Sequence, residues 1–389
     1  MSVVNKNYTV YHLHSDLSNG VTNIDSVTKY KEYVEYAKSI GMTALAFAEH
    51  GNIFEWVHKK EAIEAAGMKY IHAAEVYLTT DKNSEDKHRD NYHCVLIAKN
   101  FDGVKELNKL ISSSFNRDDY HYYYAPRIGF DELYATSDDI ICTTACLGGV
   151  LNKADNELKT EFLKFLIKNK HRCYLEIQHH NCYDQAIYNK TLYAIYKKTG
   201  VPLIAGTDTH CLNDVHVEGR SILQKGKNVF FADEESWDLT FKTYDELVNA
   251  YKIQNSLPEE VYLEAINNTN IMADSIEPFK LDYSKKYPKL YNDSEKALKE
   301  KIVEGIKYRG INKYKNFNEY KKKIQYELET YKYNGAIDFL LLEEDYKSAL
   351  KKQGVSFGYS RGSVSGSIIA YLLGITEVDS IKYNLNFER

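Results

Sequence analysis

Two histidines near the start of the chain, His12 and His14, lie one residue apart in the stretch VYHLHSD. The stretch follows an apolar, β-branched run, so we expect a strand that turns both imidazoles to one face and Leu13 to the other. Imidazole nitrogen is a preferred ligand of zinc and related divalent ions. A single His-x-His pair also occurs on ordinary exposed strands, so other residues must decide between the two interpretations.

Further histidines and acidic residues stand at or near the ends of other apolar stretches. They are Glu49, His50, Glu75, His93, His179, His180, Asp208 and His210, and Asp25 precedes the first predicted helix. Each has an ordinary alternative, such as a helix N-cap for Asp25 or a buried carboxylate paired with a lysine for Glu75. Together they favour a cluster of divalent ions that is held by imidazoles and bridging carboxylates.

The elements that must position these residues alternate along the first 210 residues. Predicted strands are Tyr8–His14, Thr43–Glu49, Lys69–Leu78, Tyr92–Ala98, Asp139–Thr144, Arg172–Gln178 and Pro202–Gly206. Predicted helices between them are Val27–Ile40, Phe101–Ser113, Leu158–Lys170 and Gln185–Lys198. Such alternation indicates a parallel sheet covered by helices. The predicted fold class is therefore α/β, with a distorted seven-stranded (βα)7 TIM-like barrel whose loops after the strand ends carry the chemistry.

The pattern changes after the barrel. Predicted helices are Leu257–Ile271, Ser294–Tyr308, Phe317–Tyr333 and Leu340–Lys352, and an apolar helix, Ile368–Ile375, follows the block YSRGSVSGS. The stretch between residues 277 and 292 has two of the five prolines and little periodicity, so it is the predicted boundary. We therefore expect a first domain over residues 1–278 and a smaller, mostly helical α+β segment over residues 279–389.

Composition limits the functional class. The 389 residues are 43% hydrophobic and 27% charged, as in soluble globular proteins, and no apolar run is long enough for a membrane span. The N-terminus lacks the apolar core of a signal peptide, and the six cysteines form no CxxC pair, so we expect reduced thiols and a cytoplasmic location. The net charge is −5, but residues 279–323 hold 14 Lys or Arg against 6 Asp or Glu, which suits either phosphate binding or a solvated helix pair.

The motifs HLHSD, AEHGN, AAEVYL, YHCVLIAKN, LEIQHH and AGTDTH resemble, in order and spacing, the PHP (polymerase and histidinol phosphatase) domain of bacterial DNA polymerase III alpha subunits, including phage forms. The resemblance covers essentially the whole chain. Motif matching implies nine metal ligands, which are His12, His14, Asp25, His50, Glu75, His93, His180, Asp208 and His210. This chain has Ile-Asp-Ser around Asp25 where the family usually has Leu-Asp-Gly. His58, His72, His88, His121, His171 and His216 lie off the motifs and are interpreted as structural.

The resemblance implies hydrolysis of phosphodiesters by a metal-dependent 3′→5′ exonuclease acting on primer 3′ ends of DNA. The implied cofactors are three divalent ions per site, zinc or manganese, with magnesium as an alternative. Asp208 or Glu75 would bridge the ions, and His50 or His210 would position the water or protonate the leaving group.

The block SRGSVSGS, followed by an apolar helix, resembles the segment of the polymerase palm that contacts the triphosphate of the incoming nucleotide. Small residues at a helix start expose backbone N–H groups that can bind an anion, although a small-residue turn can also serve packing alone. The implied triphosphate contacts are Arg361, Gly362, Ser363, Gly366 and Ser367. Tyr359 and Ser360 replace the Pro-Gly that the family usually has before them.

No Asp-x-Asp pair of the family's palm follows the block, so the chain is expected not to synthesise DNA alone. The expectation is a truncated polymerase or one part of a split polymerase that a second chain completes. Two other functions remain open. One is a phosphatase acting on a small phosphomonoester, which needs neither the SRGSVSGS block nor the basic segment. The other is a metal-stabilised scaffold without catalysis, which loss of ligands would favour.

Overall fold

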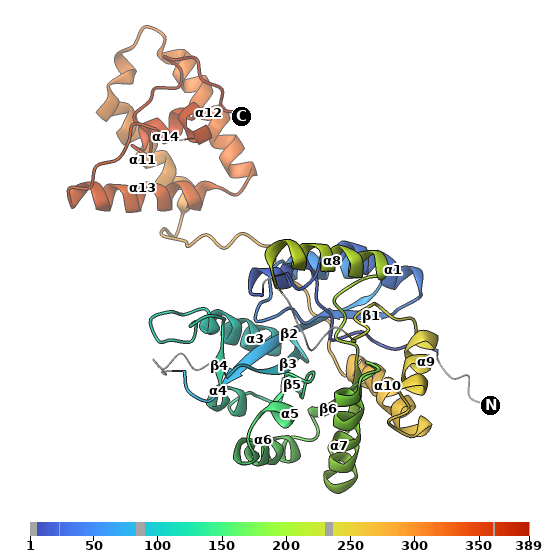
Figure 1. Cartoon of the computed structure of the whole chain (residues 1–389). Helices are drawn as coiled ribbons and strands as arrows, with labels where there is room; N and C mark the ends of the chain where they lie inside the picture. Colours follow the sequence, from blue (N-terminus) through green and yellow to red (C-terminus); the bar gives the residue numbers. More distant parts are fainter. Residues whose placement is uncertain (1–5, 23, 83–89, 230–235, 361, 389) are drawn as a thin grey trace. The chain divides into compact units, whose positions relative to one another are not determined.

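A computed structural model describes residues 6–22, 24–82, 90–229, 236–360 and 362–388. The chain divides into two compact units (Figure 1), unit 1 from Met1 to Lys280 and unit 2 from Leu281 to Arg389. Each unit has its own core, and they are described separately.

The strands of unit 1 form one curled, mixed sheet. They are β1 (Ala44–Phe47), β2 (Lys69–Thr79), β3 (Tyr92–Ala98), β4 (Ile128–Gly129), β5 (Ile140–Thr143), β6 (Cys173–Gln178) and β7 (Leu203–Gly206). Their order is β1-β2-β3-β5-β6-β7, with β4 beside β2. The α/β fold class is confirmed. The expectation of an all-parallel sheet is wrong, because β3 runs antiparallel to both β2 and β5. Strand–helix alternation carries no information on the direction of one inserted hairpin.

The predicted first strand, Tyr8–His14, is not a regular strand. Within it, Val10 forms an isolated parallel bridge to Leu45, and Leu13 forms one to Thr209. Backbone bonds from Ala46 N–H to Val10 C=O (3.0 Å) and from His14 N–H to Thr209 C=O (2.8 Å) extend these bridges. The segment therefore spans the gap between β1 and the end of β7, the two edges of the sheet.

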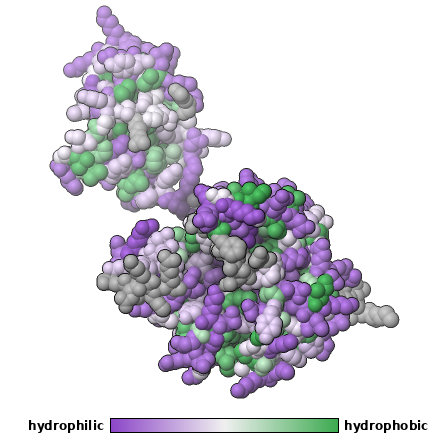
Figure 2. All heavy atoms as spheres, in the orientation of Figure 1, coloured by the Kyte–Doolittle hydropathy of each residue, from purple (hydrophilic) through white to green (hydrophobic). Residues whose placement is uncertain are grey.

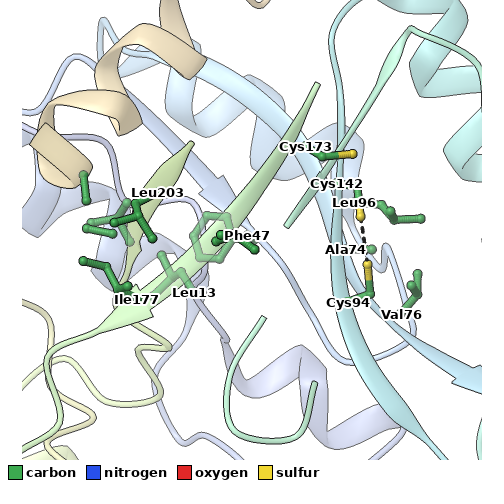
Figure 3. Close-up of a cluster of buried hydrophobic side chains, with 14 of the residues drawn as sticks. Leu13, Phe47, Ala74, Val76, Cys94, Leu96, Cys142, Cys173, Ile177 and Leu203 are labelled. Carbon is green, nitrogen blue, oxygen red and sulfur yellow. Dashed lines mark hydrogen bonds between the residues drawn. The ribbon is translucent and has the colours of Figure 1, made fainter. Parts of the chain in front are cut away.

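Alternate strand residues supply two different cores. Leu45 and Phe47 of β1, like Cys94 and Leu96 of β3, belong to the larger core, which packs against the helices. Ala44 and Ala46 belong to a second core of smaller side chains, which lies inside the curl of the sheet. Figure 3 shows the larger core, where Cys94, Cys142 and Cys173 lie on neighbouring strands and the first two sulfurs are 3.3 Å apart. This period of two follows from the pleat of a strand that is buried on both faces.

The helices of unit 1 cover the outside of the sheet. They are α1 (Tyr30–Ser39), α2 (Trp56–Ala65), α3 (Phe101–Ser114), α4 (Phe130–Tyr134), α5 (Val150–Lys153), α6 (Asn156–Lys168), α7 (Tyr183–Thr199), α8 (Asp214–Lys227), α9 (Tyr244–Gln254) and α10 (Glu259–Asp274), with a 3₁₀ turn, η1 (Asp16–Gly20). The end of α10 differs from the others because Met272, Ala273 and the following Ile276 fill the interior core. One end of the curled sheet is thereby closed with apolar side chains.

Unit 2 is helical throughout its described residues. Its elements are α11 (Ser294–Arg309), η3 (Ile311–Lys313), α12 (Phe317–Tyr333), α13 (Ile337–Lys352), η4 (Gly362–Gly366) and α14 (Ile368–Leu372). The apolar α14 lies in a core with Leu298, Ile302 and Leu341. No strand occurs among these described residues, so the β part of the predicted α+β segment is absent there.

The surface seen in Figure 2 is mainly hydrophilic, with separate hydrophobic patches. One patch lies over α8, where Val215, Ile222 and Leu223 are exposed. Among the described residues, no helix has both the length and the apolar character that a membrane span requires.

Candidate metal centre

The topology of unit 1 brings the predicted ligands to one end of the curled sheet. His50 follows β1 and pairs with Glu75 in a parallel bridge, and Asp208 and His210 follow β7. His93 is at the start of its strand, which is the opposite end. Because β3 is antiparallel to β2 and His93 pairs with Tyr77, it still reaches the edge at which the parallel strands end.

Eight buried or half-buried side chains form three overlapping ligand groups. Within each group the ligand atoms lie within 4.8 Å of one another. The groups are His14, Asp25, His50 and His210; His12, His14 and Asp208; and His50, Glu75 and His93. His14 and His50 each belong to two groups. Eight of the nine ligands implied by the resemblance therefore lie together, and the ninth, His180, belongs to none of these groups.

Three carboxylates lie between the imidazoles. Glu75 lies 2.8 Å from His50 Nδ1, 3.0 Å from His93 Nδ1 and 3.5 Å from His12 Nε2. One oxygen of Asp208 is 3.2 Å from His12 Nε2 and 3.3 Å from His14 Nε2. Each carboxylate thus contacts several imidazoles, which is the arrangement that bridging ligands of a multi-ion cluster require.

The third carboxylate is that of Asp25, on another side of the cluster. Its Oδ2 lies 3.2 Å from His50 Nε2 and 3.3 Å from His210 Nε2. Burial raises the pKa of Asp25, but the charges of His210 and His50 hold it well below its ordinary value. The Asp25 carboxylate is therefore ionised, as a metal ligand must be.

The buried carboxylates of the cluster favour positive charge on the groups beside them. Burial would lower the pKa of His12, yet Glu176, Asp208 and Glu75 raise it well above its usual range. The same opposition raises the pKa of His50, where the carboxylates are Asp25 and Glu75. Divalent ions bound in the cluster would supply this positive charge in place of protons on the imidazoles.

The residues also fit a metal by their unused atoms. His12 Nε2, His14 Nε2, Asp25 Oδ2, His50 Nδ1 and Glu75 Oε2 are buried and form no hydrogen bond of suitable geometry among the described residues, although they lie within 4 Å of oppositely charged groups of the cluster. Buried polar atoms are rarely left unsatisfied, because each costs about 1–3 kcal/mol. All five belong to the ligand groups, so divalent ions in the cluster would satisfy them.

Residues behind the ligands fix their orientation. Glu176 Oε1 lies 2.6 Å from His12 Nδ1, while Tyr11 Oη, Thr143 Oγ1 and Gln178 Nε2 donate to the same carboxylate. A side chain at Gly206 would collide with Glu176, since a Cβ there would lie 2.1 Å from its Oε1. The glycine at the end of β7 therefore makes room for this carboxylate.

A second buried carboxylate supports His14 through a hydroxyl. Ser18 Oγ lies 3.2 Å from His14 Nδ1 and donates to Glu49 at 2.6 Å. Lys59 Nζ donates to Glu49 at 2.6 Å, and Ser15 donates to it as well. Glu176 was not singled out from the sequence, and Glu49 was noted at a strand end but not as a support for His14. The available signal was a lone acidic residue inside an apolar stretch, which needs a buried partner.

Backbone strain is concentrated beside the cluster. Asp208 has a φ of 45°, Ile24 before Asp25 has 57°, and Ala145 before Cys146 has 53°. A left-handed backbone is costly for residues with a Cβ, most of all for β-branched Ile, and persists where the surroundings require it. Three such residues next to the candidate ligands indicate that ligand placement determines the local backbone.

Cys146 lies beside the cluster, although the sequence analysis did not single it out. Its sulfur lies 3.5 Å from His93 Nδ1 and 3.9 Å from Glu75 Oε1, and its side chain is buried. The His180 ring instead stacks on Trp237, with centroids 5.2 Å apart and the planes at 11°. Cys146 follows β5, the only predicted strand for which the sequence offered no candidate, so the strand-end rule could have found it.

Four of the histidines that were interpreted as structural have ordinary partners, and a fifth, His58, is exposed on α2. His72 contacts Tyr70 and Asn108, and His171 pairs with Asp138. His121 pairs with Asp119 and Glu132, and His216 contacts Thr28. His88 lies outside the described residues.

The SRGSVSGS block of unit 2 differs from the expected anion cradle. Ile368 and Ile369 N–H are not exposed, because both donate to the carboxylate of Glu327, at 3.0 Å each. Ser367 is buried, donates to Glu327 at 2.7 Å and caps α14. Gly366 is also buried, whereas Gly362 and Ser363 are exposed. Arg361 lies outside the described residues.

Comparison with known proteins defines the class first. Residues 11–180 match the family model of the PHP domain, and residues 292–389 match that of the bacterial DNA polymerase III alpha NTPase domain. Unit 1 thus contains a PHP domain. One solved structure in the comparison is a two-domain protein from Bacteroides vulgatus that contains a predicted PHP-like metal-dependent phosphoesterase. The match covers 64% of this chain and 63% of that protein, at 12% sequence identity and a TM-score of 0.34.

Relatives that align with nearly the whole chain then identify the family. The DNA polymerase III subunit alpha of Borreliella burgdorferi is 32% identical over 97% of this chain, and that of Aquifex aeolicus is 31% identical over 99%. The chain belongs to the bacterial DNA polymerase III alpha family, as its motifs implied. It spans about a third of the length of these curated relatives, 33% and 35% respectively.

Proposed function

We propose that unit 1 is a metal-dependent phosphodiesterase that removes nucleotides from DNA 3′ ends, and that the chain acts in DNA replication in the cytoplasm. One observation carries this proposal: three ligand groups share His14 and His50 around carboxylates buried in the end of the sheet. Three ligand groups could hold three divalent ions. The ions would be zinc or manganese, with magnesium as the alternative. Bound ions would supply Lewis-acid activation of water and neutralise charge on the phosphate.

The nine proposed ligands are the eight clustered residues together with Cys146 in place of His180. Glu75 and Asp208 would bridge ions, because each contacts at least two imidazoles. Glu176 and Ser18 would hold His12 and His14 in fixed orientations. Outer partners of this kind fix the tautomer of a ligating histidine and raise its basicity.

Substrate would approach from the side of His93. The side chain of His93 is 21% exposed, whereas those of His12 and His14 are fully buried. His50 lies next to it, with ring centroids 5.8 Å apart. His50 is therefore the better placed of the two suggested histidines to orient a water or to donate a proton to the leaving 3′ oxygen.

For unit 2 we propose the role that its family match suggests, a part of the polymerase that meets DNA and incoming nucleotide. Gly362 and Ser363 are the exposed candidates for a triphosphate contact. Glu327 already occupies the amides of Ile368 and Ile369, so a triphosphate would bind beside α14 rather than at those amides.

The test is digestion of a primer–template with a terminal mismatch, labelled at either primer end, in manganese, in zinc and in chelator. We expect stepwise loss of 3′ nucleotides, dependence on metal, and no activity for Asp208→Asn. If the chain hydrolysed small phosphomonoesters and left the DNA uncut, the alternative function of a phosphatase would be indicated instead. Bound metal without any hydrolysis would indicate the scaffold.

A further inference from the structure

A pocket of about 420 Å³ adjoins the exposed side of the proposed metal centre. It lies between α5, α6 and α7, which Figure 1 shows next to one another, and the segment 236–237. Its volume is in the range of small-ligand sites, about 300–1,000 Å³. The mechanism proposed above uses none of its lining side chains.

The pocket is connected to the centre at two points. Gly148 lines it, and a Cβ on Gly148 would lie 3.0 Å from the imidazole ring of His93, the most exposed proposed ligand. Trp237 lines it as well and stacks on His180. His180 follows β6 and Asp208 follows β7, and the ends of these two strands lie side by side because Gln178 pairs with Gly206. A molecule in this pocket would therefore be adjacent to the reacting phosphate.

The lining combines an aromatic face with positive charge. Trp237 is half-buried and fixed on one side by His180. Lys153 and Lys159 line the pocket, and no carboxylate of the described residues forms an ion pair with either of them. Asp184 is the single acidic residue among the described lining residues. An aromatic platform beside lysines is the combination that binds single-stranded nucleic acid, through base stacking and phosphate contact.

We propose that this pocket binds the unpaired terminal nucleotide of a DNA strand, with its base on Trp237 and phosphate oxygens at Lys153 and Lys159. The proposal rests on the nuclease function proposed above and adds the element that selects the substrate. The pocket volume suits one nucleotide and not a base pair, so a paired end must first open. Unpairing costs least at a mismatch. The pocket would therefore favour mismatched 3′ ends.

The first test is nucleotide binding without metal. The chain has two tryptophans, Trp56 and Trp237, so Trp56→Phe leaves Trp237 as the only indole. Titration with deoxyadenosine monophosphate in chelator should quench its fluorescence saturably. The double variant Lys153→Ala/Lys159→Ala should bind at least about fivefold more weakly, while Lys164→Ala, on the exposed side of α6, should bind normally.

The second test is the kinetics of the metal-loaded chain on a mismatched primer. Trp237→Ala should raise KM by about fivefold or more, as loss of one stacked base predicts, with kcat little changed, and Trp237→Phe should restore most of the loss. Absence of quenching together with an unchanged KM in Trp237→Ala would overturn the pocket proposal and leave the nuclease intact. Lysine-dependent quenching in a chain without nuclease activity would support the pocket and overturn the proposed function instead.

Discussion

At the scale of single residues, the metal centre depends on carboxylates that are not ligands themselves. Glu176 is buried, accepts three hydrogen bonds and contacts His12 Nδ1. Glu176→Gln keeps the shape but removes the charge that orients this imidazole. We expect metal affinity about 10–100-fold weaker, measured by competition with a chelator. Glu161→Gln on the exposed side of α6 is the control, and equal affinities of the two variants would contradict the assigned role.

Cys146 and His180 compete for the ninth ligand position. The sulfur of Cys146 contacts His93 and Glu75, whereas His180 stacks on Trp237. We expect Cys146→Ala to bind fewer or weaker ions per chain, and His180→Ala to keep the wild-type number, as measured by elemental analysis after dialysis. Loss of an ion in His180→Ala alone would restore the original interpretation.

The sequence indicated eight of the clustered residues but not the residues that support them. Ligating residue types at strand ends are recognisable, because only a few side chains bind divalent ions and parallel strands end at one edge. Glu176 lies 164 positions from His12, and Ser18 links His14 to Glu49, which lies 31 positions from Ser18, so no local pattern contains these links. His180 stays a prediction, because two adjacent histidines differ only in which way the chain turns them and the structure places His180 in none of the three ligand groups.

At the scale of elements, α14 depends on a residue of α12. Glu327 accepts bonds from Ser367 Oγ, Ile368 N–H and Ile369 N–H, all buried. Glu327→Ala would leave these donors unsatisfied, so we expect a loss of about 3 kcal/mol in the free energy of unfolding of unit 2. Urea denaturation followed by circular dichroism measures it. Glu329→Ala on the exposed face of α12 should change stability by less than about 0.5 kcal/mol, and equal losses would contradict the capping role.

Glu377 connects α11 and α13. Its carboxylate accepts from Arg309 at 2.6 Å and from Lys351 at 3.0 Å. Burial raises its pKa, but these two bonds hold the pKa below its ordinary value of 4.5. Its contribution to stability is therefore fully present above pH 4.5 and is lost as pH falls through the lower folded-state pKa.

The corresponding experiment compares thermal unfolding of wild type and Glu377→Gln across pH. The wild type should be more stable by up to about 1 kcal/mol at neutral pH, since the pair is partly exposed, and the difference should shrink below pH 4.5. Glu300→Gln, an exposed residue of α11, should show no such change. A difference that grows on acidification would contradict the assignment.

The bounds of the predicted helices and of most predicted strands are close to the observed ones, whereas the direction of β3 was not predicted. The predicted Phe317–Tyr333 has the bounds of α12, because its apolar positions repeat at helical spacing. The helix α2 was not predicted, since its buried face includes Lys59 and Lys60, which are buried with Glu49 and over the ring of Phe279. The segment Tyr8–His14 was wrongly predicted as a strand, because its extended backbone joins two sheet edges by single bridges.

At the scale of the whole molecule, the candidate ligands and the adjoining pocket all belong to unit 1. The sheet places candidate ligands on or next to β1, β2, β3 and β7 at one end, while the end of α10 fills the interior with apolar side chains. An ion cluster in this position would also link distant parts of the sheet. Residues 12 and 210 are nearly 200 positions apart, so metal removal should destabilise unit 1 as well as stop hydrolysis.

The most direct measurement is a manganese titration of the metal-stripped chain that records bound ions and release of 3′ nucleotides from a mismatched primer in the same samples. We expect nucleotide release to rise only as the cluster fills toward three ions per chain, and Asp208→Asn to show neither full binding nor release. Release that persists in chelator, or in Asp208→Asn, would contradict the assignment of hydrolysis to this centre.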